Sequence, residues 1–252
     1  SPFSMARGSE DLINRLDDLE KDSNIKAVVL RINSPGGTVA ATQEIYQKIW
    51  KLRKKNIVVV ASMGEVAASG GYYIASACNH IIANQGTLTG SIGVIAASPN
   101  LKGLLDRFGI KMNVIKSGKF KDSMAFHREM RDDERELIQQ LIDISYEKFI
   151  KDIALGRNMN ESDIRPVADG RVMTGETAMK YKLIDGIGTF EDAVDRARQL
   201  AELPASSPVY DEMKTPLEQF LFSVNGMFRG NGLMQGDFSM DDYYRLEYRL
   251  LP

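Results

Sequence analysis

The chain has 252 residues, enough for one α/β domain with a sizeable core or for two small domains. Its 32 lysines and arginines nearly balance 34 aspartates and glutamates, so no strong overall field would attract nucleic acid, which we do not expect as a partner. One cysteine, Cys78, and two histidines predict neither an internal disulfide nor a metal or cofactor site.

The N-terminal part begins without a methionine and with a helical pattern. The residues after Ser9 are amphipathic, with acidic residues at their start, and predict a helix. The apolar run 27–32 predicts a buried strand that ends at the turn sequence 33–37, where Gly36 and Gly37 precede another amphipathic helix. We expect that a leading segment was cut away or omitted before Ser1.

The same order then returns further along the chain. Residues 57–63 predict a second strand, Gly64 a turn, residues 67–78 a helix of small residues, and residues 80–83 a short strand. Alternation of this kind is typical of parallel strands joined by crossover helices. None of the apolar runs reaches the ~20 residues that are needed to cross a bilayer.

The second half of the chain contains longer helical patterns. Residues 114–116 predict a brief strand, and Asp132 or Asp133 is expected to cap a long helix that ends near Gly156. Thr189 opens the last clear helix. These elements complete a predicted catalytic domain over residues 1–203.

Residues 204–252 differ from the rest because prolines and glycines divide them into short pieces. We therefore predict that they form a C-terminal extension. Apolar residues still alternate over 244–250 and predict a strand. That strand could bind a groove, could be exchanged with another subunit, or could complete its own subunit.

Ser69 is the candidate nucleophile. It lies between Ala67-Ala68 and Gly70-Gly71, at a predicted change from strand to helix, where small neighbours allow a peptide backbone to approach. The N–H groups at the start of that helix favour negative charge. By composition alone, Ser69 could equally be one more small residue of a tightly packed helix.

The turn at Gly36-Gly37 belongs to the preceding strand and helix. If the two strands are parallel neighbours, this turn lies beside Gly70 and offers a second backbone N–H to a developing oxyanion. Alone, the sequence Ser-Pro-Gly-Gly is an ordinary turn. Two such turns, one strand-helix unit apart, form a more specific pattern.

The base that would activate a serine is harder to choose. His80 starts a predicted strand and His127 lies in a polar stretch, so neither is a convincing partner for Ser69. A lysine can act instead if its amine is neutral, although lowering a lysine pKa from ~10.4 to near 7 costs about 4 to 5 kcal/mol. Residue physics leaves three candidates open, namely Lys116, Lys119 and Lys121.

Four ordered motifs, at residues 33–37, 67–73, 88–93 and 117–122, together resemble the signal peptide peptidase A family, peptidase family S49, in its short, half-length Gram-positive form. The resemblance runs from about Leu12 to Leu200. It implies that Ser69 is the nucleophile and Lys121 the general base. It also implies that Gly36 and Gly70 donate oxyanion N–H groups and that Ser91 orients the lysine amine.

The resemblance further implies a crotonase-like and caseinolytic-protease-like α/β fold of repeated β-β-α units. It implies a homo-oligomer, an octamer whose subunits share active sites, and anchoring to the bacterial cell membrane by an N-terminal segment that is absent here, with a soluble catalytic domain. The implied activity is that of a serine endopeptidase with a Ser/Lys dyad, which degrades residual signal peptides and other short apolar peptides. In such relatives the C-terminal segment can occupy the substrate groove.

Three alternatives to this interpretation make different demands on the sequence. A crotonase-type acyl-CoA hydratase or isomerase would need an acidic residue beside the glycine turns, and Glu65 is the obvious one. A caseinolytic-type peptidase would need a histidine in the neighbourhood of Val94, which has none. A non-catalytic membrane scaffold subunit would leave the complete set of site residues without a use.

Overall fold

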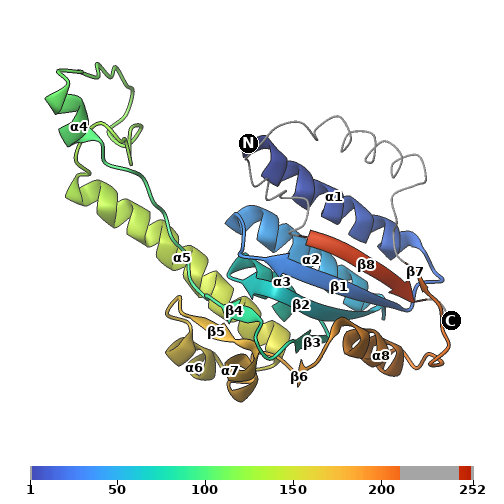
Figure 1. The fold of residues 1–252 in the computed structure, drawn as a ribbon. Helices are drawn as coiled ribbons and strands as arrows, with labels where there is room; N and C mark the ends of the chain where they lie inside the picture. The colour runs from blue at the N-terminus through green and yellow to red at the C-terminus, as the bar shows by residue number, and fades with distance from the viewer. Residues whose placement is uncertain (1, 211–243, 251–252) are drawn as a thin grey trace, which may run out of the picture.

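The computed structural model describes residues 2–210 and 244–250 (Figure 1). Its helices are α1 (Pro2–Lys21), α2 (Val39–Lys54), α3 (Gly70–Ser76), α4 (Lys102–Arg107), α5 (Asp132–Arg157), α6 (Glu161–Ile164), the 3-10 helix at Arg165–Val167, α7 (Gly175–Lys180) and α8 (Phe190–Leu200). Its strands are β1 (Ala27–Ser34), β2 (Val58–Ala68), β3 (His80–Ala83), β4 (Leu88–Gly90), β5 (Val172–Thr174), β6 (Gly186–Ile187), β7 (Val209–Tyr210) and β8 (Tyr244–Leu250).

The centre of the sheet is a parallel pair, β1 and β2. The first half of β2 pairs with β3 and its second half pairs with β4, both in parallel. On the other side, β8 runs antiparallel to β1. Because β2 is in the middle, the residue that follows it, Ser69, emerges between neighbouring strand ends.

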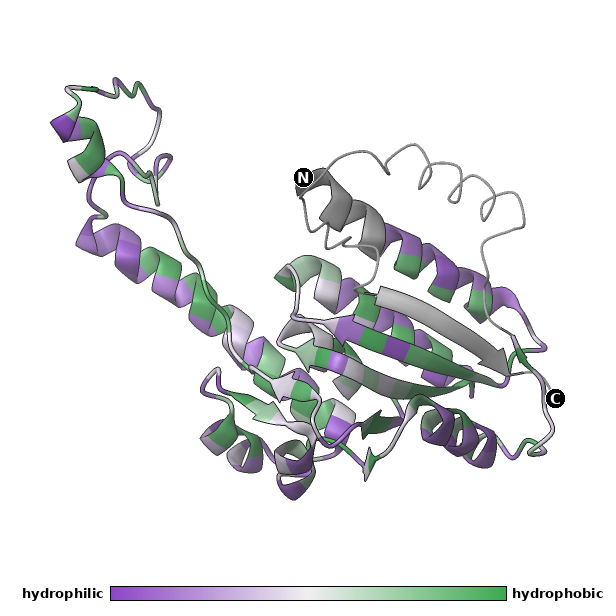
Figure 2. Ribbon diagram, in the orientation of Figure 1, coloured by the Kyte–Doolittle hydropathy of each residue, from purple (hydrophilic) through white to green (hydrophobic). Residues whose placement is uncertain are grey.

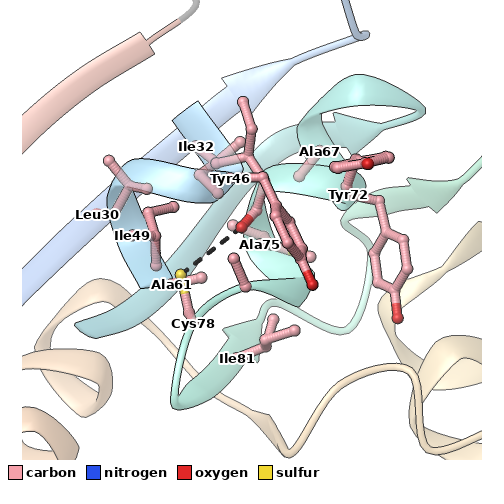
Figure 3. Close-up of a cluster of buried hydrophobic side chains, with 14 of the residues drawn as sticks. Leu30, Ile32, Tyr46, Ile49, Ala61, Ala67, Tyr72, Ala75, Cys78 and Ile81 are labelled. Atoms are coloured by element: carbon pink, nitrogen blue, oxygen red, sulfur yellow. Dashed lines mark hydrogen bonds between the residues drawn. The ribbon is translucent and has the colours of Figure 1, made fainter. Parts of the chain in front are cut away.

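Both faces of the central strands are buried, which explains their continuous apolar runs. Val28, Leu30 and Ile32 of β1 point into the larger core, formed with α1, α2 and α3. Figure 3 shows Leu30 and Ile32 in this core together with Ile49 of α2. The alternate residues of β1 point to a smaller core under α8.

One part of the described chain leaves this body. Residues 95–144 contain α4 and the first half of α5 and project away from the sheet as an arm, while the second half of α5 packs on α3 (Figure 1). Many apolar side chains of the arm are exposed, among them Ile95 (90 % exposed), Phe108 (70 %) and Ile115 (101 %). Figure 2 shows these hydrophobic segments interleaved with polar ones along the arm.

The predicted strands and helices of the core are confirmed with small changes in their ends, and the α/β class is confirmed. The predicted turn at Gly64 is wrong, because β2 continues through it to Ala68. Gly64 has another purpose: a Cβ there would lie 3.1 Å from the Asn33 side chain, whose Oδ1 accepts a hydrogen bond from the Val66 N–H. The helix consequently begins at Gly70 instead of residue 67.

Two further predictions need correction. Residues 114–116 form no strand in the described part of the chain, since they lie in the arm without a neighbouring strand. Gly156 does not end the long helix, which continues to Arg157 and closes at Asn158 in the left-handed conformation. A Cβ at Gly156 would meet the Ser76 carbonyl oxygen at 2.0 Å, so this glycine allows α5 to approach the end of α3.

The predicted strand at 244–250 is present as β8 and lies along β1 of the same chain. No helix within the described residues is long and apolar enough to span a bilayer.

Candidate active site

Ser69 occupies a strained turn between β2 and α3. Its φ of 51° and ψ of −119° are unusual for a residue with a side chain. Two backbone bonds hold it there: its N–H donates to the Gly90 carbonyl at 2.9 Å, and its own carbonyl accepts from the Tyr73 N–H at 2.9 Å. The sharp turn leaves Ser69 only partly buried between buried neighbours, as a nucleophile requires.

The start of α3 fits closely against the turn that follows β1. A Cβ at Gly70 would lie 2.9 Å from the Gly37 nitrogen, and a Cβ at Gly71 would lie 2.8 Å from the Ser34 carbonyl oxygen. Both neighbours are backbone atoms, which cannot move without shifting the turn. Glycine at positions 70 and 71 is therefore what brings the two glycine turns together.

Gly36 faces Ser69 directly. A Cβ built at Gly36, whose φ is +130°, would lie 3.2 Å from Ser69 Oγ and 3.1 Å from the Gly70 nitrogen. The Gly36 N–H itself donates to the Oγ of buried Ser34 at 3.2 Å. The structure therefore assembles Ser69, Gly36 and Gly70 into one cradle within a single chain.

Ser91 follows the strand residue that anchors Ser69. Gly90 accepts the Ser69 N–H, and Ser91 comes next with a left-handed φ of 50° and its N–H bonded to the Arg171 carbonyl at 2.7 Å. These bonds fix the Ser91 backbone beside the cradle.

Lys121 is not brought to Ser69 within one chain. It lies in the segment between α4 and α5, at the far end of the arm, whereas Ser69 is in the body of the molecule (Figure 1). Lys121 is exposed, and within the described residues its amine makes no hydrogen bond or ion pair. The five predicted site residues thus divide into four in the core and one on the arm.

Sequence reasoning missed a polar junction between α3 and α5. The Tyr73 hydroxyl, four residues after Ser69, donates to the carboxylate of buried Asp152, and Lys148 Nζ binds the same carboxylate at 2.6 Å. Burial and the adjacent carboxylate raise the pKa of Tyr73, which keeps the phenol protonated as a donor. The signal that the sequence offered was a tyrosine within an apolar helical segment soon after a candidate nucleophile, because a tyrosine that is buried there needs a hydrogen-bond partner.

The other residues that could serve as nucleophile or base are placed elsewhere. His80 pairs with Val60, at the opposite end of β2 from Ser69, and lies 3.8 Å from Asp185. Burial lowers its pKa. Cys78 is buried in the core, and burial raises its pKa to about 12, so its thiol is not a reactive nucleophile (Figure 3). The described residues contain no cluster of His, Cys, Asp and Glu that could hold a metal ion.

Two family models match parts of the chain. The model of Peptidase family S49 matches residues 51–204, and that of Clp protease matches residues 5–84, which contain Gly36, Gly70 and Ser69. A Synechocystis protein named "Putative protease slr0021" is 43% identical over 84% of this chain and 76% of its own length.

Two further relatives carry more specific names. "Putative signal peptide peptidase SppA" of Enterococcus faecium is 36% identical over 77% of this chain and 56% of its own length. "Serine protease SPPA, chloroplastic" of Arabidopsis thaliana is 38% identical over 80% of this chain and 30% of its own length.

The crotonase-like fold, the strained serine and these matches define the class of protein, a serine endopeptidase. The chain belongs to peptidase family S49 and resembles its signal peptide peptidase members. The hydratase and scaffold alternatives are set aside by this membership.

Proposed function

We propose that the protein cleaves peptide bonds with a Ser/Lys dyad in which Ser69 of one subunit is paired with Lys121 of a neighbouring copy. The observation that carries this proposal is the division of the site. Ser69 sits in a finished cradle, whereas Lys121 is presented on an arm that leads away from it. A second copy is the simplest source of a base for each serine.

The chemistry has two stages, acylation and deacylation, and in each the amine takes up one proton and then gives it away. The uncharged amine of Lys121 takes the proton of Ser69 Oγ–H as the oxygen attacks the carbonyl carbon of the substrate. The N–H groups of Gly36 and Gly70 stabilise the oxyanion, for which Gly36 would exchange its bond to Ser34. The protonated amine then gives the proton to the leaving nitrogen as the peptide C–N bond breaks, which leaves an acyl-enzyme. In the second stage the amine takes a proton from water as the water oxygen attacks the acyl carbon, and it returns that proton to Ser69 Oγ as the ester bond breaks. Ser91 would orient the amine.

Apolar surface on the arm supports assembly. Monomeric proteins seldom expose this many large apolar side chains in one region. Burying them between copies would also exclude water around the dyad, and a lysine enclosed by apolar surface favours its uncharged form. An octamer with shared sites meets both needs.

The same apolar surroundings favour apolar substrates. A site that is dry enough for a neutral lysine disfavours charged side chains nearby. We therefore propose remnants of signal peptides and other short apolar peptides as substrates, handled at the bacterial cell membrane. The name of the Enterococcus faecium relative points to the same substrates for that protein.

A fluorophosphonate probe tests the proposal. The assembled wild-type protein should be labelled at Ser69, and both Ser69→Ala and Lys121→Ala should lose labelling and peptide turnover by at least about 1,000-fold. Turnover should rise on the alkaline side and should be unaffected by chelators.

Mixing the two inactive variants tests the sharing of sites. Ser69→Ala subunits still carry Lys121, and Lys121→Ala subunits still carry Ser69, so co-assembly should restore a fraction of the activity. A mixed assembly that stays inactive would contradict sharing, and full activity of Lys121→Ala would contradict the dyad.

A further inference from the structure

A cluster of charged side chains surrounds the segment that carries Lys121. We define the lysine loop as residues 116–124 and the Arg128 cluster as Lys116, Asp122, Arg128, Arg131 and Glu134. We propose that the Arg128 cluster is a positioning device that fixes the lysine loop on the end of α5, so that Lys121 is presented to its serine in a single orientation. This inference rests on the proposed function and adds residues to it.

The cluster is anchored by a buried carboxylate. Glu134, in the first turn of α5, has a side chain with 0% exposure. It accepts hydrogen bonds from Arg128 Nη1 at 2.8 Å, from Arg128 Nη2 and from the Arg131 N–H at 3.0 Å, and it forms an ion pair with Arg131 Nη2 at 2.8 Å. A buried carboxylate is costly unless it is paired in this way, so its partners are held firmly.

Arg128 connects that anchor to the residue beside Lys121. While its two terminal nitrogens bind Glu134, its Nε donates to Asp122 Oδ2 at 3.1 Å and its Nη2 donates to the Asp122 carbonyl at 2.8 Å. A planar guanidinium can make these contacts together, whereas a lysine ammonium is a single point of charge. Arg128 therefore links Asp122 to the first turn of α5.

The other side of Lys121 is held by two more cations. The Lys119 carbonyl accepts from Lys116 Nζ at 3.2 Å and from Arg131 Nη2 at 3.0 Å. Lys116 also pairs with the Asp122 carboxylate. The backbone turn bonds of the loop are long, such as Lys121 N–H to the Gly118 carbonyl at 3.4 Å, and Ser123 Oγ donates to the Phe120 carbonyl at 2.8 Å. The cluster adds contacts to α5 that these turns do not supply.

Lys121 is excluded from this network although it lies in its middle. Its immediate neighbours Phe120 and Asp122 contact Arg131 and Arg128, and Lys119 pairs with Asp133. The Lys121 amine, by contrast, has no hydrogen-bond or ion-pair partner among residues 2–210 and 244–250. The residues around Lys121 are thus held by α5 and by one another, which leaves the Lys121 amine available to a group of another subunit.

The principal test is Glu134→Gln, which keeps the shape of the side chain and removes its charge. We expect kcat to fall about 10- to 100-fold with KM changed less than about threefold, because the base is misplaced while the cradle and substrate contacts are intact. The matched control is Glu147→Gln on the same helix. Glu147 also pairs with an arginine, Arg165, at 2.8 and 2.7 Å, but far from the lysine loop, so kcat should be unchanged.

Subunit mixing then locates the defect. In co-assembly with Ser69→Ala, the Ser69 of a Glu134→Gln subunit meets an intact lysine loop, and we expect turnover at least about fivefold above that of Glu134→Gln alone. In co-assembly with Lys121→Ala, each surviving serine meets either a defective loop or no lysine, and turnover should not rise.

The opposite pattern would overturn the inference. Recovery with Lys121→Ala but not with Ser69→Ala would show that Glu134→Gln damages the serine side instead of the loop. A kcat within twofold of wild type would also refute it, as long as Lys121→Ala is inactive. Should Lys121→Ala itself remain active, the proposed dyad fails and not the cluster alone. If Glu134→Gln does not assemble, Arg128→Lys replaces it in the same mixing test, since it keeps the charge but cannot bridge Asp122 and Glu134.

Discussion

The surroundings of Ser69 and of Lys121 are built in opposite ways. Ser69 lies in a dense part of the core. Backbone atoms of Gly37 and Ser34 lie so close to the glycines that follow Ser69 that a Cβ atom on either glycine would clash with them. Lys121 lies on the arm, where charged side chains hold the loop and large apolar residues such as Ile115 are exposed. The proposed nucleophile is thus preformed by packing within one chain.

The different demands on the proposed nucleophile and the proposed base explain this contrast. A nucleophile and its oxyanion donors must agree within fractions of an ångström, which close packing of strands and helices provides. A base delivered to another subunit must instead be rigid on its own arm and exposed before assembly. Charged contacts meet that requirement because they hold a loop without needing an apolar core.

Among the substitutions that test this contrast, we expect the largest effect on assembly and turnover from changes to the apolar surface of the arm. Replacing Ile95 and Ile115 together by aspartate places two charges on a surface that the proposed assembly buries. We expect a smaller particle by analytical ultracentrifugation and a loss of turnover of at least about 1,000-fold, because a general base no longer reaches Ser69.

The matched control for this double variant is Leu155→Asp. Leu155 is also well exposed, at 63%, but it lies on the half of α5 beside the core. Its particle mass and turnover should be those of the wild type. An equal loss in both proteins would mean that the arm is not a special surface.

A smaller loss is expected from the core side. In Gly71→Ala the new Cβ would meet the Ser34 carbonyl oxygen at 2.8 Å and push the Gly36 turn away from Ser69. A displacement of this kind should lower kcat/KM by about 100-fold while the assembly persists. Gly86→Ala is the control, because a Cβ at Gly86 meets nothing within 4 Å. Steady-state kinetics of the two variants decides the matter, and equal rates would argue against a tight cradle.

Low pH should destabilise the arm before the core, without any mutation. The bonds from Arg128 lower the pKa of Glu134 to about 2, below the ordinary value of about 4.3 that it has in the unfolded chain. A carboxyl with a depressed pKa stabilises the fold fully above the unfolded value, and this stabilisation is lost as the pH falls from about 4.3 toward 2. Arg128 and Lys116 lower the pKa of Asp122 in the same direction.

Amide hydrogen exchange, corrected for its intrinsic pH dependence, would measure this loss of stabilisation as the carboxyl groups are protonated. Peptides from residues 116–134 should lose protection across that pH range before peptides from β2 do, because apolar packing in the core does not titrate. The Glu134→Gln protein should show weaker protection of the arm already at neutral pH and a smaller acid transition. If β2 opens first, the charged contacts are not what holds the arm.

The sequence predicted the core better than the arm. The apolar run 27–32 and the turn at Gly36 are local signals, so the strand, the turn and the strand-to-helix position of Ser69 could be read from the residues. Gly64 and Gly156 were misread as breaks because a glycine at a close approach and a glycine at a turn look the same in sequence. Only the contacts to Asn33 and Ser76 distinguish them.

The arm could not be predicted because its partners are distant or lie outside the chain. The apolar residues of 114–116 resembled a short strand, and nothing in the sequence says that no strand lies beside them. Glu134 and Arg128 were not recognised as a pair, although six residues separate them across the predicted start of a helix. Lys121 itself was chosen by resemblance, since Lys116 and Lys119 fit the residue physics equally well.

The smallest effect is expected where the core and the arm helix meet. Tyr73→Phe removes the hydrogen bond from Tyr73 to Asp152, while Lys148 still binds that carboxylate. We expect a loss of about 1–2 kcal/mol in the free energy of unfolding, because one buried bond to a charged group is removed. The fall in kcat/KM should be less than about tenfold, since the Tyr73 N–H still holds the Ser69 carbonyl.

Tyr146→Phe on α5 is the matched control for this junction. The Tyr146 hydroxyl donates to the Ala168 carbonyl at 2.8 Å, away from α3, so its removal should lower the melting temperature without changing the rate. If Tyr73→Phe, like Tyr146→Phe, lowers the stability and leaves the rate unchanged, α5 only supports the packing of α3. If its rate falls as well, the helix that carries the lysine loop also steadies the serine of its own chain, and a single rigid element then sets the positions of both halves of the site.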